Sequence, residues 1–196
     1  MTATITRRLP AVERREAILD AAKPVFGARG YHASTTREIA AAAGVSEALL
    51  YQHFPGKRQL FEAVINRAAA DLEGRIVAAE QASEPLQAAM RAYFDFVAEE
   101  SDLYRVFFRE ALQEDPAFQQ LYVEISRRLL ALSERHLTSV SEKPARPALL
   151  AHALAGMVSE LALWWVEDRS LALDEVVERA ARMGEAMYRT EVSDGS

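Results

Sequence analysis

Hydrophobic positions recur with a helical period along almost the whole chain. Near the N-terminus, apolar residues at i, i+3, i+4, i+7 and i+8 mark one face of a helix. These residues are Ile18, Ala21, Ala22, Val25 and Phe26. β-branched residues are sparse and no strand-like alternation persists, so we predict no strands. The pattern predicts an all-α protein of about nine helices, with a three-helix N-terminal head followed by a larger helical body.

The head contains two short helices whose ends are marked by specific residues. Thr35 and Glu38 have the spacing of a capping box, in which each side chain accepts from the other residue's backbone N–H. Gly44 should end this helix in the left-handed region, and Ser46 should cap the next helix. Two short helices joined around a glycine are typical of a helix-turn-helix, which we place at about residues 35–54.

The helix before this motif contains a proline. Pro24 should remove a hydrogen bond to Asp20 and bend the last turn. Gly27 and Gly30 should then end the helix.

Caps and prolines divide the rest of the chain into longer helices. Ser83 should cap one of them, with Pro85 in its first turn, and Asp115 should cap another before Pro116. The predicted helices cover residues 57–81, 83–100, 102–114, 115–140, 148–168 and 174–190. We place the domain boundary at residue 57, which gives a head of residues 1–57 and a body of residues 58–196.

Composition excludes several kinds of chemistry. The 196 residues are 50% apolar and 27% charged, which is ordinary for a globular protein. There is no cysteine, so disulfides, thiolate zinc sites, iron–sulfur clusters and cysteine nucleophiles are excluded. No dinucleotide-binding glycine motif, P-loop or His-Glu-x-x-His occurs, and no histidine has the Glu-x-x-His spacing of di-iron bundles. We therefore expect no catalytic residues, no metal and no cofactor.

The most apolar stretch, from Leu149 to Val166, is about as long as one membrane span. It contains His152, Ser159 and Glu160, which favours a buried helix of a soluble protein. The N-terminal sequence has no apolar run after its arginines, so we expect no secretory signal. The expected location is the cytoplasm, without a membrane partner.

Charge is divided unevenly along the chain. Residues 1–58 carry nine Lys and Arg against five Asp and Glu, a net charge of +4. The remainder carries 14 against 24, a net charge of −10. A basic head on an acidic body indicates contact with a polyanion, and the alternative is a chance asymmetry of a solvated surface.

In a helix-turn-helix the second helix enters the major groove, with its N-terminal residues at the base edges. Gln52 could pair with adenine, Glu47 could accept from cytosine, and Ala48 or Leu49 could meet a thymine methyl group. Glu47 opposes DNA affinity unless it reads a cytosine, and its alternative role is to support the start of the helix.

Hydroxyl, imidazole and cationic side chains around this helix are candidate phosphate contacts. Arg37 could reach a guanine or a phosphate. Tyr51 and Phe54 could both pack in the core, but we expect packing for Phe54 and a phosphate contact for Tyr51. The candidate DNA contacts are Thr35, Thr36, Arg37, Ser46, Glu47, Ala48, Leu49, Tyr51, Gln52, His53 and Lys57.

The run TTREIAAAAGVSEALLYQHFPGK, residues 35–57, resembles the DNA-binding head of TetR-family transcription regulators. Its most specific parts are Gly-Val-Ser from Gly44, Leu-Tyr-x-His-Phe from Leu50, and Lys57; the close resemblance covers roughly residues 11–65. It implies a homodimer that binds a palindromic double-stranded DNA operator, usually as a repressor, with a small-molecule effector in the body. Pro24 and Glu47 depart from the family pattern.

Aromatic residues and methionines crowd the central helices of the body. Each could be ordinary core, but together they fit the apolar or aromatic effector that the resemblance implies. Arg91, Arg105, Arg109 and His152 are candidate polar contacts for it. The candidate ligand-binding residues are Met90, Tyr93, Phe94, Phe107, Phe108, Leu112, Tyr122 and His152.

The helix near residues 148–166 is apolar on nearly every side, and the last helix has a stripe with small residues at its centre. We expect these helices to pair with their copies in a second subunit, and the alternative is that they complete the core of the single chain. The predicted interface comprises Leu150, Leu154, Met157, Leu161, Trp165, Val177, Ala180, Ala181, Gly184 and Met187.

Taken together, the sequence predicts a ligand-responsive, DNA-binding transcription regulator. We expect a homodimeric repressor that a small, largely apolar effector releases from its operator. The alternative is an all-helical small-molecule-binding protein or enzyme whose head no longer binds DNA.

Overall fold

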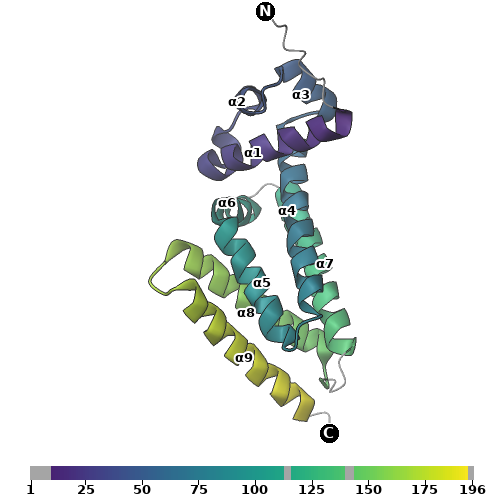
Figure 1. The fold of residues 1–196 in the computed structure, drawn as a ribbon, viewed down its shortest axis with the longest axis vertical. Helices are drawn as coiled ribbons and strands as arrows, with labels where there is room; N and C mark the ends of the chain where they lie inside the picture. The colour runs from purple at the N-terminus through teal and green to yellow at the C-terminus, as the bar shows by residue number, and fades with distance from the viewer. Residues whose placement is uncertain (1–9, 113–115, 140–143, 194–196) are drawn as a thin grey trace, which may run out of the picture. The chain divides into compact units, whose positions relative to one another are not determined.

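The computed structural model describes residues 10–112, 116–139 and 144–193. Within these ranges the chain forms nine α-helices and no strand, which confirms the predicted fold class (Figure 1). The helices are α1 (Ala11–Ala33), α2 (Thr36–Ala42), α3 (Glu47–His53), α4 (Lys57–Ala79), α5 (Pro85–Glu99), α6 (Ser101–Leu112), α7 (Pro116–Ser139), α8 (Pro147–Glu167) and α9 (Leu173–Ser193).

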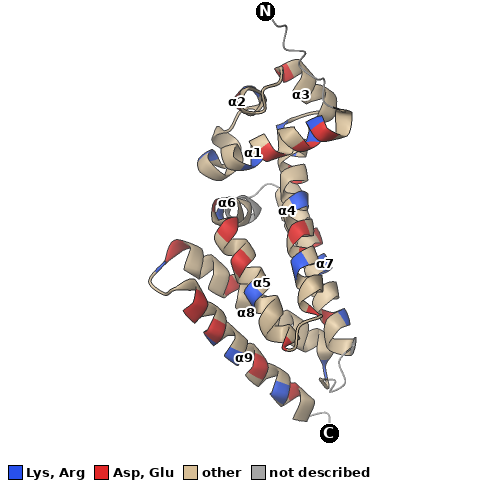
Figure 2. Cartoon of the chain, viewed as in Figure 1, with Lys and Arg blue, Asp and Glu red and all other residues tan. Residues whose placement is uncertain are grey.

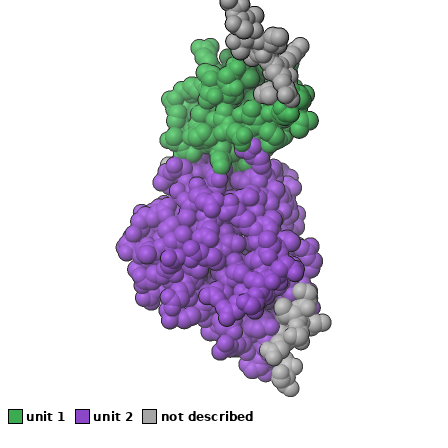
Figure 3. All heavy atoms as spheres, viewed as in Figure 1, with its two compact units in different colours: residues 1–65 green, residues 66–196 purple. Residues whose placement is uncertain are grey.

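The contacts divide the chain into two compact units, residues 1–65 and residues 66–196 (Figure 3). Residue 57, where the sequence analysis places the boundary, is the first residue of α4. The first turns of α4 group with unit 1 because Leu60, Phe61 and Val64 are buried. Each unit is described separately below.

Unit 1 is built around apolar residues from its four helical segments. Ile18, Phe26, Ile39, Leu50 and Phe61 are fully buried, and the rings of Phe26 and Phe61 meet edge to face with centroids 5.0 Å apart. The predicted apolar face of the first helix is confirmed at Ile18, Ala22 and Phe26, which are fully buried. This core holds α2 and α3 in fixed positions relative to α1.

The end of α1 agrees with its prediction at Gly30 and differs from it at Gly27. The helix accommodates Pro24 and continues past Gly27, so the predicted stop at Gly27 is wrong. Gly30 has φ of +76°, in the region that favours glycine, and this kink separates a final turn that runs to Ala33.

Unit 2 consists of the rest of α4 together with α5 to α9. Helix α5 packs against both α8 and α9, while α7 packs against α6 and α8 (Figure 1). Pro85 occupies the first turn of α5 as predicted, but the residue before it, Glu84, takes the cap position that was assigned to Ser83 and makes no side-chain cap hydrogen bond. Asp115, the other predicted cap, lies outside the described residues.

Most residues assigned to the dimer interface lie in the core of unit 2 instead. The reason is that α5 covers the apolar faces of α8 and α9. A Cβ atom on Gly184 would lie 2.2 Å from Cε of Met90, so this small residue permits the close approach of α9 to α5. The buried members of the predicted set are Leu150, Leu154, Trp165, Val177, Ala180, Ala181 and Gly184; Met157, Leu161 and Met187 are half-buried.

Helix α8 is long and apolar enough to cross a membrane by length and composition alone. Less than half of its most apolar window is buried in the structure. A core helix of a soluble protein passes the same test, so this feature is weak evidence for a membrane span.

Candidate nucleic-acid interface and ligand cavity

The helix-turn-helix of unit 1 has the helix caps and the turn that its sequence predicts. The backbone N–H of Glu38 donates to Oγ1 of Thr35 at 3.2 Å, and the backbone N–H of Thr35 donates to Oε2 of Glu38 at 3.0 Å. Gly44 has φ of +66°, and the Leu49 N–H donates to Oγ of Ser46 at 3.2 Å. These contacts confirm the predicted capping box, left-handed turn and second cap.

One face of α3 stays outside the core of unit 1. Leu50 and Phe54 are buried, which confirms the predicted packing of Phe54. Ala48, Tyr51 and Gln52 are exposed on the other side. Helix α3 therefore offers an aliphatic group, a phenol and an amide to a partner outside the unit.

Glu47 is tied to α2 by both carboxylate oxygens. The Thr36 hydroxyl donates to Oε1 of Glu47 at 2.7 Å, and Nε of Arg37 lies 3.8 Å from Oε2. The hydroxyls of Thr36 and Tyr51 lie 3.1 Å apart. The carboxylate thus links α2 to α3 and partly neutralises Arg37. This role was not predicted from the sequence, although the opposite charges of Arg37 and Glu47 on either side of the turn were a signal for it.

The ammonium group of Lys57 lies against the end of α1. Its Nζ donates to the carbonyl oxygens of Tyr31 at 2.9 Å, His32 at 3.2 Å and Ser34 at 2.9 Å, and it lies 4.5 Å from the centre of the Tyr31 ring. Three acceptors match the three N–H donors of an ammonium group. Lys57 therefore fastens the start of α4 to the end of α1, and its predicted phosphate contact stays a prediction.

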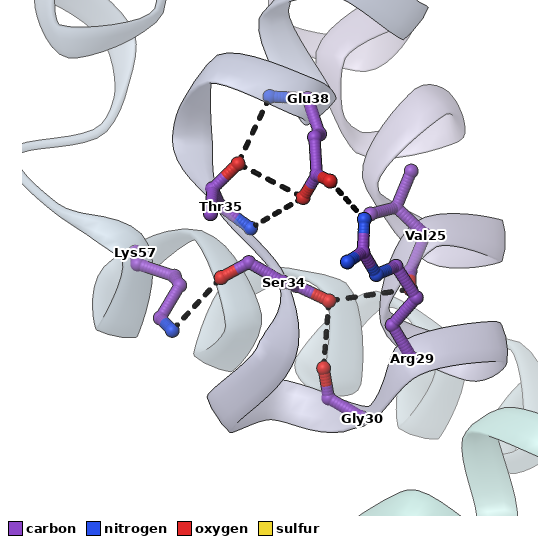
Figure 4. A network of polar contacts seen from close by, with 7 residues as sticks. All are labelled: Val25, Arg29, Gly30, Ser34, Thr35, Glu38 and Lys57. Atoms are coloured by element: carbon purple, nitrogen blue, oxygen red, sulfur yellow. Dashed lines mark hydrogen bonds and ion pairs between the residues drawn. The ribbon is translucent and has the colours of Figure 1, made fainter.

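A polar network holds the junction between α1 and α2 (Figure 4). The hydroxyl of Ser34, which is buried, donates to the carbonyl of Gly30 at 2.6 Å. The guanidinium of Arg29 pairs with the Glu38 carboxylate, which also completes the capping box of Thr35. These side chains fix the orientation of α2, and hence of the turn that leads to α3.

The predicted DNA contacts gather around α2, α3 and the start of α4, all within unit 1. The exposed members are Thr35, Arg37, Ser46, Ala48, Tyr51 and Gln52, and the half-buried members are Thr36, Glu47, Leu49, His53 and Lys57.

Unit 2 contains a cavity of about 330 Å³ between the end of α4 and the helices α5, α7 and α8. Four of the predicted ligand-binding residues line it: Met90, Tyr93, Tyr122 and His152. Most other lining side chains are aliphatic, which is usual for a small-molecule site.

Three predicted ligand-binding residues lie elsewhere. Phe94 is fully buried in the core between the helices. Phe107 and Phe108 pack in an aromatic cluster of α6 and α7, where Phe108 lies 4.5 Å from the ring of Tyr104 and 5.5 Å from that of Tyr122. These three residues are part of the wall behind the cavity and not of its lining.

The remaining predicted polar contacts also differ from the sequence analysis. Arg91 is engaged by Asp95 and Asp174, and Arg105 by Asp102, so neither guanidinium lines the cavity. The side chains of Arg109 and Leu112 lie outside the described residues.

Two tyrosines form a hydrogen-bonded group at the cavity wall. The hydroxyls of Tyr93 and Tyr104 lie 3.0 Å apart, and that of Tyr93 lies 3.3 Å from Oγ of Ser159. Burial raises the pKa of both phenols above the ordinary value for tyrosine, so they remain neutral hydroxyls. Within the described ranges, no group of three His, Asp or Glu residues is arranged to hold a metal ion.

A helix-turn-helix with an exposed second helix, followed by a helical unit with an apolar cavity, is the arrangement of a DNA-binding transcription regulator. Comparison with known families agrees. Residues 18–64 match the model for bacterial regulatory proteins of the tetR family, and residues 82–186 match the tetracyclin repressor-like C-terminal domain. The chain belongs to the TetR family.

Two relatives of known name, FasR and BepR, are transcription regulators, in agreement with the sequence prediction. The transcriptional activator FasR of Mycolicibacterium smegmatis is 33% identical over 87% of this chain and 81% of FasR. The repressor BepR of Brucella suis is 50% identical over 30% of this chain and 28% of BepR. A tetR-family regulator from Streptomyces coelicolor has a solved structure with a TM-score of 0.79, at 28% identity, over 94% of this chain and 84% of that chain.

Proposed function

We propose that the protein is a cytoplasmic, homodimeric repressor that binds a palindromic operator and is released by a small, largely apolar ligand. The observation that carries the proposal is the pairing, in one chain, of an exposed α3 face and an apolar cavity of about 330 Å³. Its acidic body would be repelled by the DNA backbone, so the basic residues of the head favour DNA contact through unit 1.

The exposed residues of α3 support a division of labour on DNA. The amide of Gln52 is suited to an adenine edge in the major groove, and Ala48 and Leu49 to thymine methyl groups. Arg37 and Tyr51 are suited to phosphates on the groove margins. Thr36 and Ser46 add hydroxyls near the same margin, with His53 and Lys57 as further candidates.

An apolar stripe on the outside of α8 and α9 supports dimerisation. Leu149 and Trp164 on α8, and Met183 on α9, are large apolar side chains that remain exposed. Between the first two, the same face of α8 carries Ala153, Gly156 and one charged residue, Glu160. The outer surface of α9 otherwise carries ion pairs between acidic and basic residues one turn apart (Figure 2). Pairing with a second copy would cover the stripe, as an isologous interface requires.

Repression is the direction of regulation that needs the fewest further contacts. A dimer that occupies a promoter blocks transcription without binding RNA polymerase. FasR is named an activator and BepR a repressor, so the relatives include both directions of regulation. A ligand releases the operator only if it binds the free and the DNA-bound conformations unequally.

A mobility-shift assay tests the proposal. The full-length protein is mixed with native DNA that flanks its coding region, at low and at physiological salt, beside a scrambled fragment of equal length. The proposal expects binding to a native fragment that weakens steeply with salt, and a transcription reporter that falls when the protein is expressed. Failure to bind any native fragment would favour a small-molecule-binding protein with an inactive head.

A further inference from the structure

The cavity of unit 2 contains a carboxylate that has one oxygen without a hydrogen bond to the described residues. Glu80 follows the last residue of α4 and lines the cavity. Its Oε1 atom is buried and accepts no hydrogen bond from the described residues, and the side chain as a whole is 27% exposed. The nearest cationic candidate is Nδ1 of His136, which also lines the cavity, at 3.8 Å, longer than a hydrogen bond.

A buried carboxylate oxygen without a donor is costly. Removing such an atom from water loses its hydration, and the loss is recovered only when a donor or a cation replaces the water. Buried polar atoms are almost always satisfied by protein, water or ligand, so Oε1 of Glu80 can accept a hydrogen bond from a molecule in the cavity. The partner that fits Glu80 carries N–H donors and, preferably, a positive charge.

The other polar groups of the lining do not compete for that role. Among the described residues that line the cavity, Glu80 is the sole carboxylate, and neither Lys nor Arg is present. The histidines His136 and His152 are the other ionisable side chains besides the tyrosines. An anionic ligand would therefore meet a carboxylate with no fixed cation to offset it, which disfavours fatty acids at this end.

The cavity is elongated along α7. Ser126, Leu129, Ser133 and Leu137, which lie on one face of that helix, all contribute to the lining. Ser126 and His136 are separated by roughly 15 Å at the rise of an α-helix. The polar group at Glu80 therefore stands at one end of an apolar channel that continues toward Tyr122.

We propose that the cavity binds an amphiphile with an apolar chain and a terminal amine, and that the ammonium group pairs with Glu80. This inference rests on the proposed function, of which it names the ligand class. The aliphatic walls of α5, α7 and α8 cover the chain, while Glu80 selects the charge of its end.

Titration calorimetry on the full-length protein tests the proposal with three probes of equal chain length: decylamine, decanol and decanoate. We expect decylamine to bind about tenfold or more tightly than decanol, because a charge pair in a partly buried site exceeds a neutral hydrogen bond by at least that factor. Decanoate should bind most weakly.

Two variants and a matched control assign the selectivity to Glu80. Glu80→Gln and, as a second variant, Glu80→Ala should reduce the advantage of decylamine over decanol to about twofold or less, with decanol affinity nearly unchanged. Glu84→Gln, at an exposed carboxylate outside the cavity lining, should leave the order of the probes intact.

Three results would overturn the inference: decanoate binding as tightly as decylamine, an unchanged preference in both Glu80 variants, or no binding of any probe. A mobility-shift assay of the ligand-free protein separates this failure from failure of the proposed function. Binding of decylamine without release of DNA would leave the ligand class intact and contradict ligand-controlled repression.

Discussion

At the scale of single residues, Glu47 shows how the environment decides what a side chain can do. It lies in the first turn of α3, and side chains at such positions contact base edges in a helix-turn-helix. In the structure its oxygens face Thr36 and Arg37 on α2. A carboxylate held in this way links the two helices, and we expect it to repel phosphates rather than to accept from cytosine.

Glu47→Gln should therefore tighten DNA binding. The amide can still accept from Thr36, while the negative charge near the DNA backbone is lost. We expect an affinity gain of about two- to tenfold at low salt, with a smaller gain at high salt. Fluorescence anisotropy on a specific fragment and its single-base variants checks this; a changed preference at one base pair would show instead that Glu47 reads that base.

At the scale of elements, Lys57 joins the start of α4 to the end of α1. Lys57→Met keeps most of the side-chain volume but removes the donors to three carbonyl groups. The free energy of unfolding should fall by about 1–3 kcal/mol, because those carbonyls lose a charged partner. Denaturant unfolding measured without DNA checks this.

Arg37→Met is the matched control for Lys57. The Arg37 side chain is 88% exposed, so its loss should weaken DNA binding and leave stability within about 0.5 kcal/mol of the parent. Equal unfolding curves for Lys57→Met and the parent would contradict a structural role for Lys57.

The packing of α9 on α5 gives a second test at this scale. Gly184→Ala places a methyl group 2.2 Å from Cε of Met90, the far end of a flexible side chain that can shift, so the cost should lie at the lower end of about 1–3 kcal/mol. Gly156→Ala on α8 meets no atom within 4 Å and should be neutral or stabilising. Thermal unfolding of both variants measures the difference; equal destabilisation would show that Met90 is not the limiting contact.

The helices and their ends could be predicted because their causes are local. Thr35 with Glu38, Gly44 and Ser46 determine the turn within a few residues of sequence. The partners of Glu47, Gly184 and Phe94 could not be predicted, because they depend on which helices meet across the fold. An apolar stripe such as that of α9 looks the same whether it faces α5 or a second subunit.

At the scale of the whole molecule, the exposed apolar stripe on α8 and α9 should control the oligomeric state. Leu149→Glu with Trp164→Glu would place two charges in the proposed interface, where like charges meet across the two-fold axis. We expect a dimeric parent and a monomeric double variant in light scattering coupled to size-exclusion chromatography.

Val123→Glu is the control for this substitution. Val123 is also an exposed apolar residue, but it lies on α7 and outside the stripe. It should leave the dimer intact, and a monomer from this variant or a dimer from the double variant would move the interface away from α8 and α9.

The reading of DNA by α3 is tested most directly by Gln52→Ala in an anisotropy titration against a native promoter fragment and its single-base variants, with Tyr51→Phe beside it. We predict that Gln52→Ala relaxes the preference at one base position by roughly 1–3 kcal/mol, whereas Tyr51→Phe weakens binding to all fragments alike. Equal losses on every fragment for both variants would contradict the account, as would wild-type protein that binds native and scrambled DNA equally.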